Sequence, residues 1–229
     1  LNDTLQIRKE KILIPFSHTN EIAKPGFYQV KLDNNIQCAF TATSRNGFHK
    51  YRFPNKAGWL RFDMGFSINW DKSTDGMLQI IDDYTIVGYR YSTGWAKGQK
   101  VYFAAKFSSK IKDHLFIDDS VVTNKKAVGK NVKLALQFNT SNPLLARVGL
   151  SSVSTEKALQ SLSETANTTF DQVVANADVL WEKELQKIKV ETTTKQQAQQ
   201  FYTALYRTCL APVIHSDADG AYQTHDNKQ

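Results

Sequence analysis

The chain has 229 residues, which suits one large domain or one domain with part of a second. Hydrophobic residues make up 41% of it and include 13 Phe, 9 Tyr and 4 Trp, which is ample for a packed core and excludes an intrinsically disordered protein. The net charge of +7 comes from Lys and Arg scattered along the chain, without the aromatic-and-basic clusters typical of nucleic-acid binding, so we expect no nucleic-acid partner.

The first residues carry no export signal, because Leu1–Thr4 has neither a basic nor an apolar region. A trimmed or internal start explains this as well as a cytoplasmic location does. The apolar runs, such as Ile12–Ile14, are far too short to cross a membrane, so no membrane span is predicted.

Ser17–Glu21 places His18 three residues before Glu21. The Pro25-Gly26 turn signal that follows argues against a helix. We expect a loop in which His18 and Glu21 are hydrogen-bonded to each other. A metal site or an acid/base pair is the alternative.

From about residue 27 to residue 151 the apolar residues recur with a period of two, which indicates strands. Turn signals such as Asn46-Gly47 and Asn142-Pro143 separate them. About ten strands with no helices between them predict a large antiparallel β-sandwich. The alternation is seen at residues 28–32 and 36–42, and further strand-like runs follow at Trp59–Met64, Met77–Ile81, Thr85–Tyr91, Lys100–Phe107, Leu115–Asp118, Val132–Phe138 and Leu144–Leu150.

After Leu150 the period changes to that of helices. Ser154 can cap a short helix, and two longer helices are predicted at about Phe170–Val190 and Lys195–Leu210, the last ended by Pro212. The predicted fold is therefore mostly β, with helices at the end. We expect a β domain over residues 1–151, a helical linker over 152–192 and the start of a helical domain over 193–229.

The tail Asp217–Asp226 is dense in carboxylates and histidines. It nearly matches a calcium-binding loop, but His215 stands at the first ligand position and Asp226 replaces the bidentate Glu at the last. An Asp-rich turn that hydrogen-bonds its own backbone is the favoured interpretation. A loop at the rim of an active site is the alternative.

The tryptophans are a further group of candidates, because a flat aromatic ring complements the C–H face of a sugar. Trp59, Trp70 and Trp95 could act in this way, although core packing is the favoured interpretation for each. The sequence has no Ser-His-Asp order, Gly-rich phosphate loop or HExxH motif. The residues alone thus give no complete catalytic set.

Several stretches, taken in order, resemble glycoside hydrolase family 92, the calcium-dependent exo-acting α-mannosidases. The resemblance covers nearly the whole chain. It is carried by Phe16–Glu21, Ala23–Val30, Phe40–Arg45, Gly47–His49, Tyr51–Pro54, Gly94-Trp95, Val101–Phe103, Phe107-Ser108, Val148–Ser154, Trp181, Leu185, Ile188, Phe201–Tyr206 and Asp217–Asp226.

The resemblance implies a β-sandwich joined by linker helices to an (α/α) barrel that carries the active site. It further implies an inverting glycosidase that removes mannose from the non-reducing ends of glycans, with acid and base about 6.5–9.5 Å apart. A bound calcium ion and export to the periplasm or cell surface are also implied.

Relative to the family pattern, the chain starts part-way through the sandwich and ends before the acid, base and calcium ligands. We therefore expect no catalytic or metal-binding residue within 1–229, and no activity from this chain alone; its intramolecular partner would be the remaining catalytic domain. Weak candidates for substrate contacts are His18, Glu21, Trp95, Asp217, Asp219 and Asp226. A stand-alone carbohydrate-binding or adhesion module is the alternative function.

Overall fold

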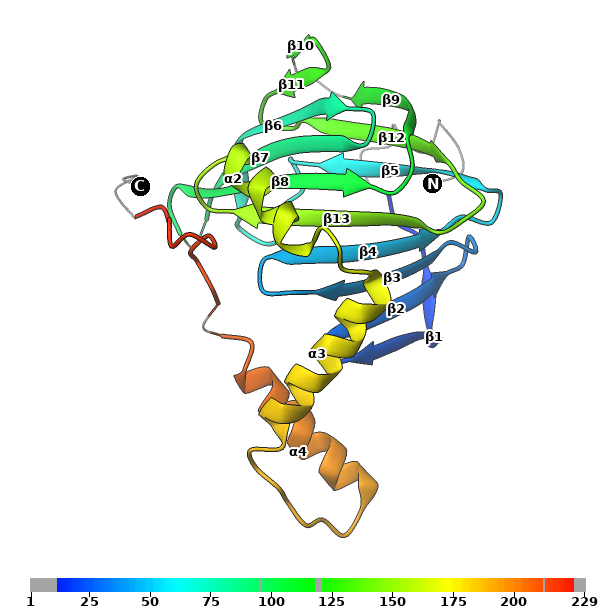
Figure 1. The fold of residues 1–229 in the computed structure, drawn as a ribbon, viewed down its shortest axis with the longest axis vertical. Coiled ribbons are helices and arrows are strands. Elements are labelled where there is room, and N and C mark those ends of the chain that lie inside the picture. The colour runs from blue at the N-terminus through cyan, green and yellow to red at the C-terminus, as the bar shows by residue number, and fades with distance from the viewer. Residues whose placement is uncertain (1–11, 95, 118–120, 212, 225–229) are drawn as a thin grey trace.

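The computed structural model describes residues 12–94, 96–117, 121–211 and 213–224. A broad β-sandwich forms the body, and helices lie on one of its faces and beyond it (Figure 1). The strands are β1 (Phe16–Lys24), β2 (Phe27–Leu32), β3 (Gln37–Ala42), β4 (Asn46–Arg52), β5 (Ala57–Asp63), β6 (Lys72–Asp82), β7 (Thr85–Thr93), β8 (Gln99–Phe107), β9 (Ile111–Ile117), β10 (Val121–Thr123), β11 (Lys126–Val128), β12 (Lys133–Asn139) and β13 (Leu144–Ser151).

Two antiparallel sheets build the sandwich. Within the described residues, one has ten strands in the order β1-β2-β3-β4-β13-β8-β7-β6-β11-β10, and the other has three in the order β5-β12-β9. The prediction of a mostly β, antiparallel sandwich is confirmed. Strand β1 was missed: residues 17–21, expected to form a loop, lie in an edge strand whose pairing with β2 is irregular between Phe16 and Glu21.

The core lies between the sheets, where the apolar side chains of the central strands are buried. On β12, Leu134, Leu136 and Phe138 are completely buried and pack with Leu78 and Ile86 of the large sheet. Burying a side chain of this size stabilises the fold by about 1.5–3 kcal/mol. The period of two in the sequence thus marks the side chains that join the sheets.

The outer face of the large sheet is covered by α2 (Thr155–Ser161) and the short 3₁₀ helix η1 (Leu162–Thr165). Ser154 caps α2 as predicted, because its hydroxyl accepts a hydrogen bond from the Lys157 amide. Gly149 on β13 permits the contact: a Cβ there would lie 2.2 Å from Ser161 Oγ. The glycine is needed for the close approach of helix and sheet.

Helix α3 (Phe170–Leu185) also packs on the large sheet, with Phe170 and Val173 against Ala39 and Phe48. Thr169 and Gln172 form a capping box at its start. The helix ends at Leu185, five residues before the predicted Val190, because Gln186 forms its C-cap and a short turn follows. The sheet therefore carries helices on both β13 and β3.

Helix α4 (Lys195–Thr208) lies beside α3, and the two extend away from the sandwich (Figure 1). The Trp181 ring on α3 meets the Tyr206 ring on α4 edge to face, with centroids 4.8 Å apart. No residue of α4 is fully buried. The chain then returns to one end of the sandwich as residues 213–224, here called the return segment.

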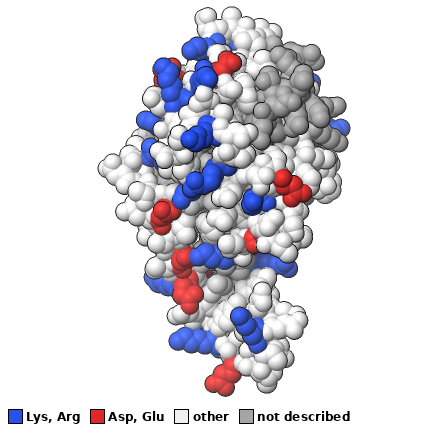
Figure 2. Space-filling view, turned by 90° about the vertical axis from the view of Figure 1, so that its right-hand side faces the viewer, with Lys and Arg blue, Asp and Glu red and all other residues white. Residues whose placement is uncertain are grey.

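Lys and Arg are dispersed over the face shown in Figure 2 and alternate with neutral residues. This pattern agrees with the interpretation of the net positive charge as a contribution to solubility. In the part of the chain that the structure describes, no helix combines the length and apolar character that a membrane crossing requires.

Candidate functional site

A pocket of about 670 Å³ lies where the return segment meets the end of the sandwich; we call it the end pocket. Its walls come from the β3–β4 turn, the β7–β8 turn, the end of β13 and the return segment. The residues that line it include Arg45, Asn46, Lys97, Lys100, Ser151, His215 and Asp217. The pocket thus lies between the sandwich and the return segment, which belongs to the part of the chain expected to begin the helical domain.

Asp217 is the predicted site residue that reaches this pocket, and it is only 8% exposed. Its carboxylate accepts a 2.6 Å hydrogen bond from the hydroxyl of Ser151 at the end of β13. The same hydroxyl oxygen accepts a bond from the Val153 amide. Because the carboxylate is held in this network, its role in the structure is to fasten the return segment.

Further contacts fasten the same segment. Arg45 Nε donates to the Ser216 carbonyl at 3.2 Å, and the Ser152 hydroxyl donates to the His215 carbonyl at 3.1 Å. Lys157 on α2 forms an ion pair with Asp219. Lys157, and after it the Ala221 amide, lowers the pKa of the Asp219 carboxyl.

The Asp219 side chain therefore contacts α2 through Lys157 and does not line the end pocket. Its side chain also accepts a hydrogen bond from the Ala221 amide at 3.2 Å, and the Gly220 amide donates to the Asp217 carbonyl. The prediction that this turn hydrogen-bonds its own backbone is confirmed.

Asn46 lines the end pocket and was missed as a site residue. It is 1% exposed, and its Nδ2 donates to the Ser161 carbonyl at 3.1 Å. Its Oδ1 has no hydrogen-bond partner in the described part of the chain. A buried amide oxygen without a partner costs free energy, and a bound hydroxyl or water would relieve that cost. The sequence showed only the turn signal Asn46-Gly47.

The end pocket suits a polar ligand but does not contain a hydrolytic pair. Hydrolysis of a glycosidic bond requires two carboxyl groups on opposite sides of the sugar. Among the described lining residues Asp217 is the single carboxylate, and it is bonded to Ser151. What the pocket offers is an amide, hydroxyls and cationic side chains.

His18 and Glu21 form the predicted pair, with His18 Nδ1 and Glu21 Oε1 2.6 Å apart. Tyr28 donates its hydroxyl proton to the other oxygen of Glu21 at 2.8 Å. The hydrogen bond with His18, and after it the one from Tyr28, lowers the pKa of the Glu21 carboxyl. The pair lies on the edge strand β1, with the His18 side chain 88% exposed, and does not line the end pocket.

The tryptophans differ from one another. Trp59 is 7% exposed and belongs to the core, as predicted. Trp70 is 65% exposed in the β5–β6 loop, so the prediction of core packing is wrong there. Trp95 and Asp226 lie outside the described residues.

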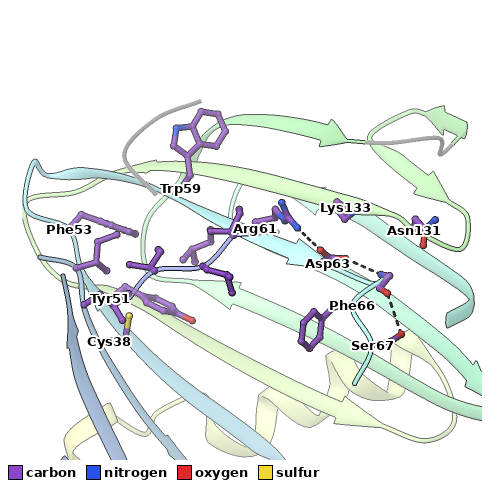
Figure 3. A pocket seen from close by; sticks show the side chains of 17 residues that line it. Cys38, Tyr51, Phe53, Trp59, Arg61, Asp63, Phe66, Ser67, Asn131 and Lys133 are labelled. Carbon is purple, nitrogen blue, oxygen red and sulfur yellow. Dashed lines mark hydrogen bonds and ion pairs between the residues drawn. The ribbon is translucent and has the colours of Figure 1, made fainter. Parts of the chain in front are cut away.

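A larger cleft of about 1040 Å³ runs along β5 between the two sheets (Figure 3). Tyr51 and Cys38 lie at one part of it, and the Arg61–Asp63 ion pair lies at another. Burial raises the pKa of the Cys38 thiol to about 11, so its thiolate is scarce at neutral pH. Trp59 lines this cleft, but His18, Glu21, Asp217 and Asp219 do not.

The described residues contain no group of three or more His, Cys, Asp or Glu side chains that could hold a metal ion. The calcium ion implied by the family resemblance therefore does not fit the side chains described, and no chemical step is derived through it.

The chain matches known protein families and solved structures. Residues 2–151 match the glycosyl hydrolase family 92 N-terminal domain, and residues 157–229 match the glycosyl hydrolase family 92 catalytic domain. A relative from Arthroderma benhamiae, described as an uncharacterized secreted glycosidase, is 24% identical over 232 residues, covering 89% of this chain and 30% of the relative.

Similar solved structures include two mannosidases of family GH92. One is a family GH92 α-mannosidase from Bacteroides thetaiotaomicron, with a TM-score of 0.87 and 29% identity, covering 94% of this chain and 31% of that one. The other, a family GH92 inverting mannosidase from Bacteroides thetaiotaomicron VPI-5482, has a TM-score of 0.80 and 24% identity over 92% of this chain and 29% of that one, and shows the fold alone.

The chain thus spans about three tenths of the length of these relatives. The match to the N-terminal model runs over residues 2–151, well over half of the chain, and the catalytic-domain model takes up the match shortly afterwards. The chain belongs to glycosyl hydrolase family 92.

Proposed function

We propose that this chain is part of an exo-acting α-mannosidase that hydrolyses α-mannosidic bonds at the non-reducing ends of glycans with inversion. The observation that carries the proposal is the likeness to a family GH92 α-mannosidase over 94% of this chain, at 29% identity. The family models, which match on both sides of the sandwich–helix junction, support the same reading.

In this proposal the acid and the base come from residues outside 1–229. The acid protonates the leaving oxygen, and the base activates a water on the opposite face of the sugar. The calcium ion is also proposed to be held by residues outside this chain.

The residues of this chain position the catalytic domain. Ser151 with Asp217, Lys157 with Asp219 and Arg45 with the Ser216 carbonyl hold the return segment against the sandwich. Displacing a reacting group by about 1 Å can cost on the order of a hundredfold in rate. These contacts would therefore matter for activity without touching the reacting atoms.

The intramolecular partner is proposed to be the remainder of the catalytic domain. Large apolar side chains are exposed on the β5–β6 loop and around the end pocket, and Gly94 brings the β7–β8 turn close to Asp71 of that loop. An exposed apolar group of this kind marks an interaction surface. Its members are Phe66, Ile68, Trp70, Val101, Leu150, Val213 and Ile214.

The substrate is proposed to be a mannose-containing glycan, and the protein is proposed to be exported to the periplasm or cell surface. The relative described as a secreted glycosidase supports export. The hydroxyl and cationic side chains among the residues that line the end pocket support a ligand rich in hydroxyl groups.

Release of mannose from an α-linked mannobiose tests the proposal, measured for residues 1–229 and for the longer protein encoded by the same gene, each with calcium and with a chelator. We expect release from the longer protein in calcium alone, with α-mannose becoming β-mannose in the product. Residues 1–229 should release none.

Turnover by residues 1–229 would contradict the assignment of acid and base to other residues. A longer protein that cleaves α-glucosides but not α-mannosides would contradict the proposed substrate. A variant of the longer protein, Asp217→Asn, changes a positioning residue only. It should still give the inverted product, but at a lower rate.

A further inference from the structure

A second pocket, of about 910 Å³, lies on the other side of the β3–β4 turn; we call it the seam pocket. It is formed where the ends of β2 and β3 meet α3 and α4. Residues Ala42, Thr43 and Ser44 line both this pocket and the end pocket. The two pockets are therefore neighbours separated by one turn.

Aromatic rings line the helical wall of the seam pocket. Trp181 and Tyr206 come from the helices, with centroids 4.8 Å apart. Both side chains are half-buried, so part of each ring remains accessible. On the sandwich side Phe27 lines the pocket from the face of the sheet that α3 covers, whereas the neighbouring Tyr28 and Phe40 pack with the core between the sheets.

Polar groups stand among these rings. Thr43 and Ser44 supply hydroxyls on the turn, and Glu184 on α3 supplies a carboxylate, which also pairs with Lys187. The Tyr28 hydroxyl is held by Glu21. Pockets that bind small molecules combine apolar and aromatic walls with a few polar groups, and enclose about 300–1,000 Å³.

The position of Trp181 is fixed by the β1–β2 turn. Gly26 has φ +76°, and a Cβ there would lie 2.7 Å from Ala177 Cβ and 3.0 Å from Trp181 Cδ1. The Gly26 carbonyl accepts a 2.7 Å bond from the Thr41 hydroxyl. Lys24 pairs with Asp178 at 2.7 Å on the same side. The wall of the pocket is thus built by close contacts between turn and helix.

We propose that the seam pocket binds a sugar ring of the same glycan whose end is cleaved, with the ring lying against Trp181. Aromatic faces, hydroxyls and one carboxylate are complementary to the C–H face and hydroxyls of a neutral hexopyranose. The choice of mannose as the sugar rests on the proposed function. Because the two pockets share a turn, an α-linked mannotriose should bind more tightly than methyl α-mannoside.

Isothermal titration calorimetry tests this in residues 1–229 and in the longer protein. We expect α-linked mannotriose to bind, with maltotriose as the comparison sugar binding more weakly. Trp181→Leu should weaken binding about tenfold, whereas Trp181→Phe, which keeps an aromatic ring, should retain most of it. In residues 1–229, Trp70→Leu changes an exposed tryptophan outside the pocket and should leave the affinity unchanged.

Tyr206→Leu is the second variant. Because no residue of α4 is fully buried, removing the Tyr206 ring should not unfold the sandwich. It too should weaken binding, and circular dichroism checks the fold of each variant. Unchanged affinity in both Trp181→Leu and Tyr206→Leu would overturn the proposal. Lack of binding in the longer protein would also overturn it, because it would show that the remaining domain occupies the pocket.

The result is separable from that of the mannosidase test. If the longer protein releases no mannose but binds mannotriose through Trp181, the proposed activity fails and the seam pocket stands. If it releases mannose and Trp181→Leu binds mannotriose as well as the unchanged protein does, the seam pocket fails alone.

Discussion

The hydroxyl of Ser151 donates a 2.6 Å hydrogen bond to the carboxylate of Asp217, and so joins the last residue of β13 to a residue 66 positions later. Both partners are buried. The bond links the sandwich to the segment that matches the family's catalytic domain. It makes the return segment part of the sandwich surface.

Removing this carboxylate should destabilise the chain. Asp217→Ala leaves the buried Ser151 hydroxyl without its acceptor, and we expect a loss of about 1–3 kcal/mol in the free energy of unfolding. Urea denaturation of both proteins measures it. Asp178→Ala, which removes one partner of an exposed ion pair, is the control and should change stability by less than about 1 kcal/mol. Equal effects of the two substitutions would contradict the structural role of Asp217.

Gly149 should not tolerate a side chain. A Cβ at this position would lie 2.2 Å from Ser161 Oγ and 2.4 Å from the Ala158 carbonyl oxygen, so α2 would have to move off the sheet. We expect Gly149→Ala to cost about 1–3 kcal/mol, the usual cost of overpacking. Gly47→Ala is the matched control, since its Cβ would meet nothing nearer than 3.4 Å. Thermal unfolding distinguishes the two, and equal midpoints would show that α2 can shift freely.

The Lys157–Asp219 pair should make stability depend on pH. The folded pKa of Asp219 is lowered, so its contribution is present above the unfolded pKa of about 3.9 and is lost as the pH falls through the folded pKa. Lys157→Met removes the main cause. The stability difference between the two proteins should therefore be present at neutral pH and shrink in acid.

Carbon NMR titration of the Asp219 carboxyl measures this pKa directly. It should rise toward the ordinary value in Lys157→Met, because the charge is removed while a side chain of similar length remains. Lys110→Met, at another exposed pair, serves as the control and should leave Asp219 unchanged. An unaltered Asp219 pKa in Lys157→Met would show that the ion pair does not form in solution.

Trp70 should become protected in the longer protein. It is exposed in the β5–β6 loop, whose backbone is held because Arg90 donates to the Met64 and Phe66 carbonyls. If the remaining catalytic domain covers this loop, acrylamide should quench Trp70 less in the longer protein than in residues 1–229. Trp70→Phe in both proteins isolates its signal. Equal quenching would place the domain interface elsewhere.

Local patterns were enough to find most of the elements. Leu134, Leu136 and Phe138 alternate with less apolar or smaller residues, and they form the buried face of β12. Ser154 was identified as a cap because a hydroxyl before a helix satisfies a backbone amide whatever the rest of the fold does.

Elements with weak local signals were missed. Strand β1 carries polar residues around an irregular pairing, so no period of two marks it, and the Pro25-Gly26 signal indicated only the turn that follows. Strands β10 and β11 have three residues each, too few to show a period. Their turn uses Asn124 and Lys125 at positive φ, and the lysine gave no turn signal.

The sequence by itself determined the strand-rich body, the helices that follow and, through its ordered motifs, the family. Each of these depends on residues close together along the chain. Only the tertiary structure decided that Asp217 fastens to Ser151, that Asn46 lines a pocket and that Trp181 faces Tyr206. These contacts join residues far apart in sequence, and the return of the chain to the sandwich brings Asp217 to Ser151 through long-range packing, which no local pattern encodes.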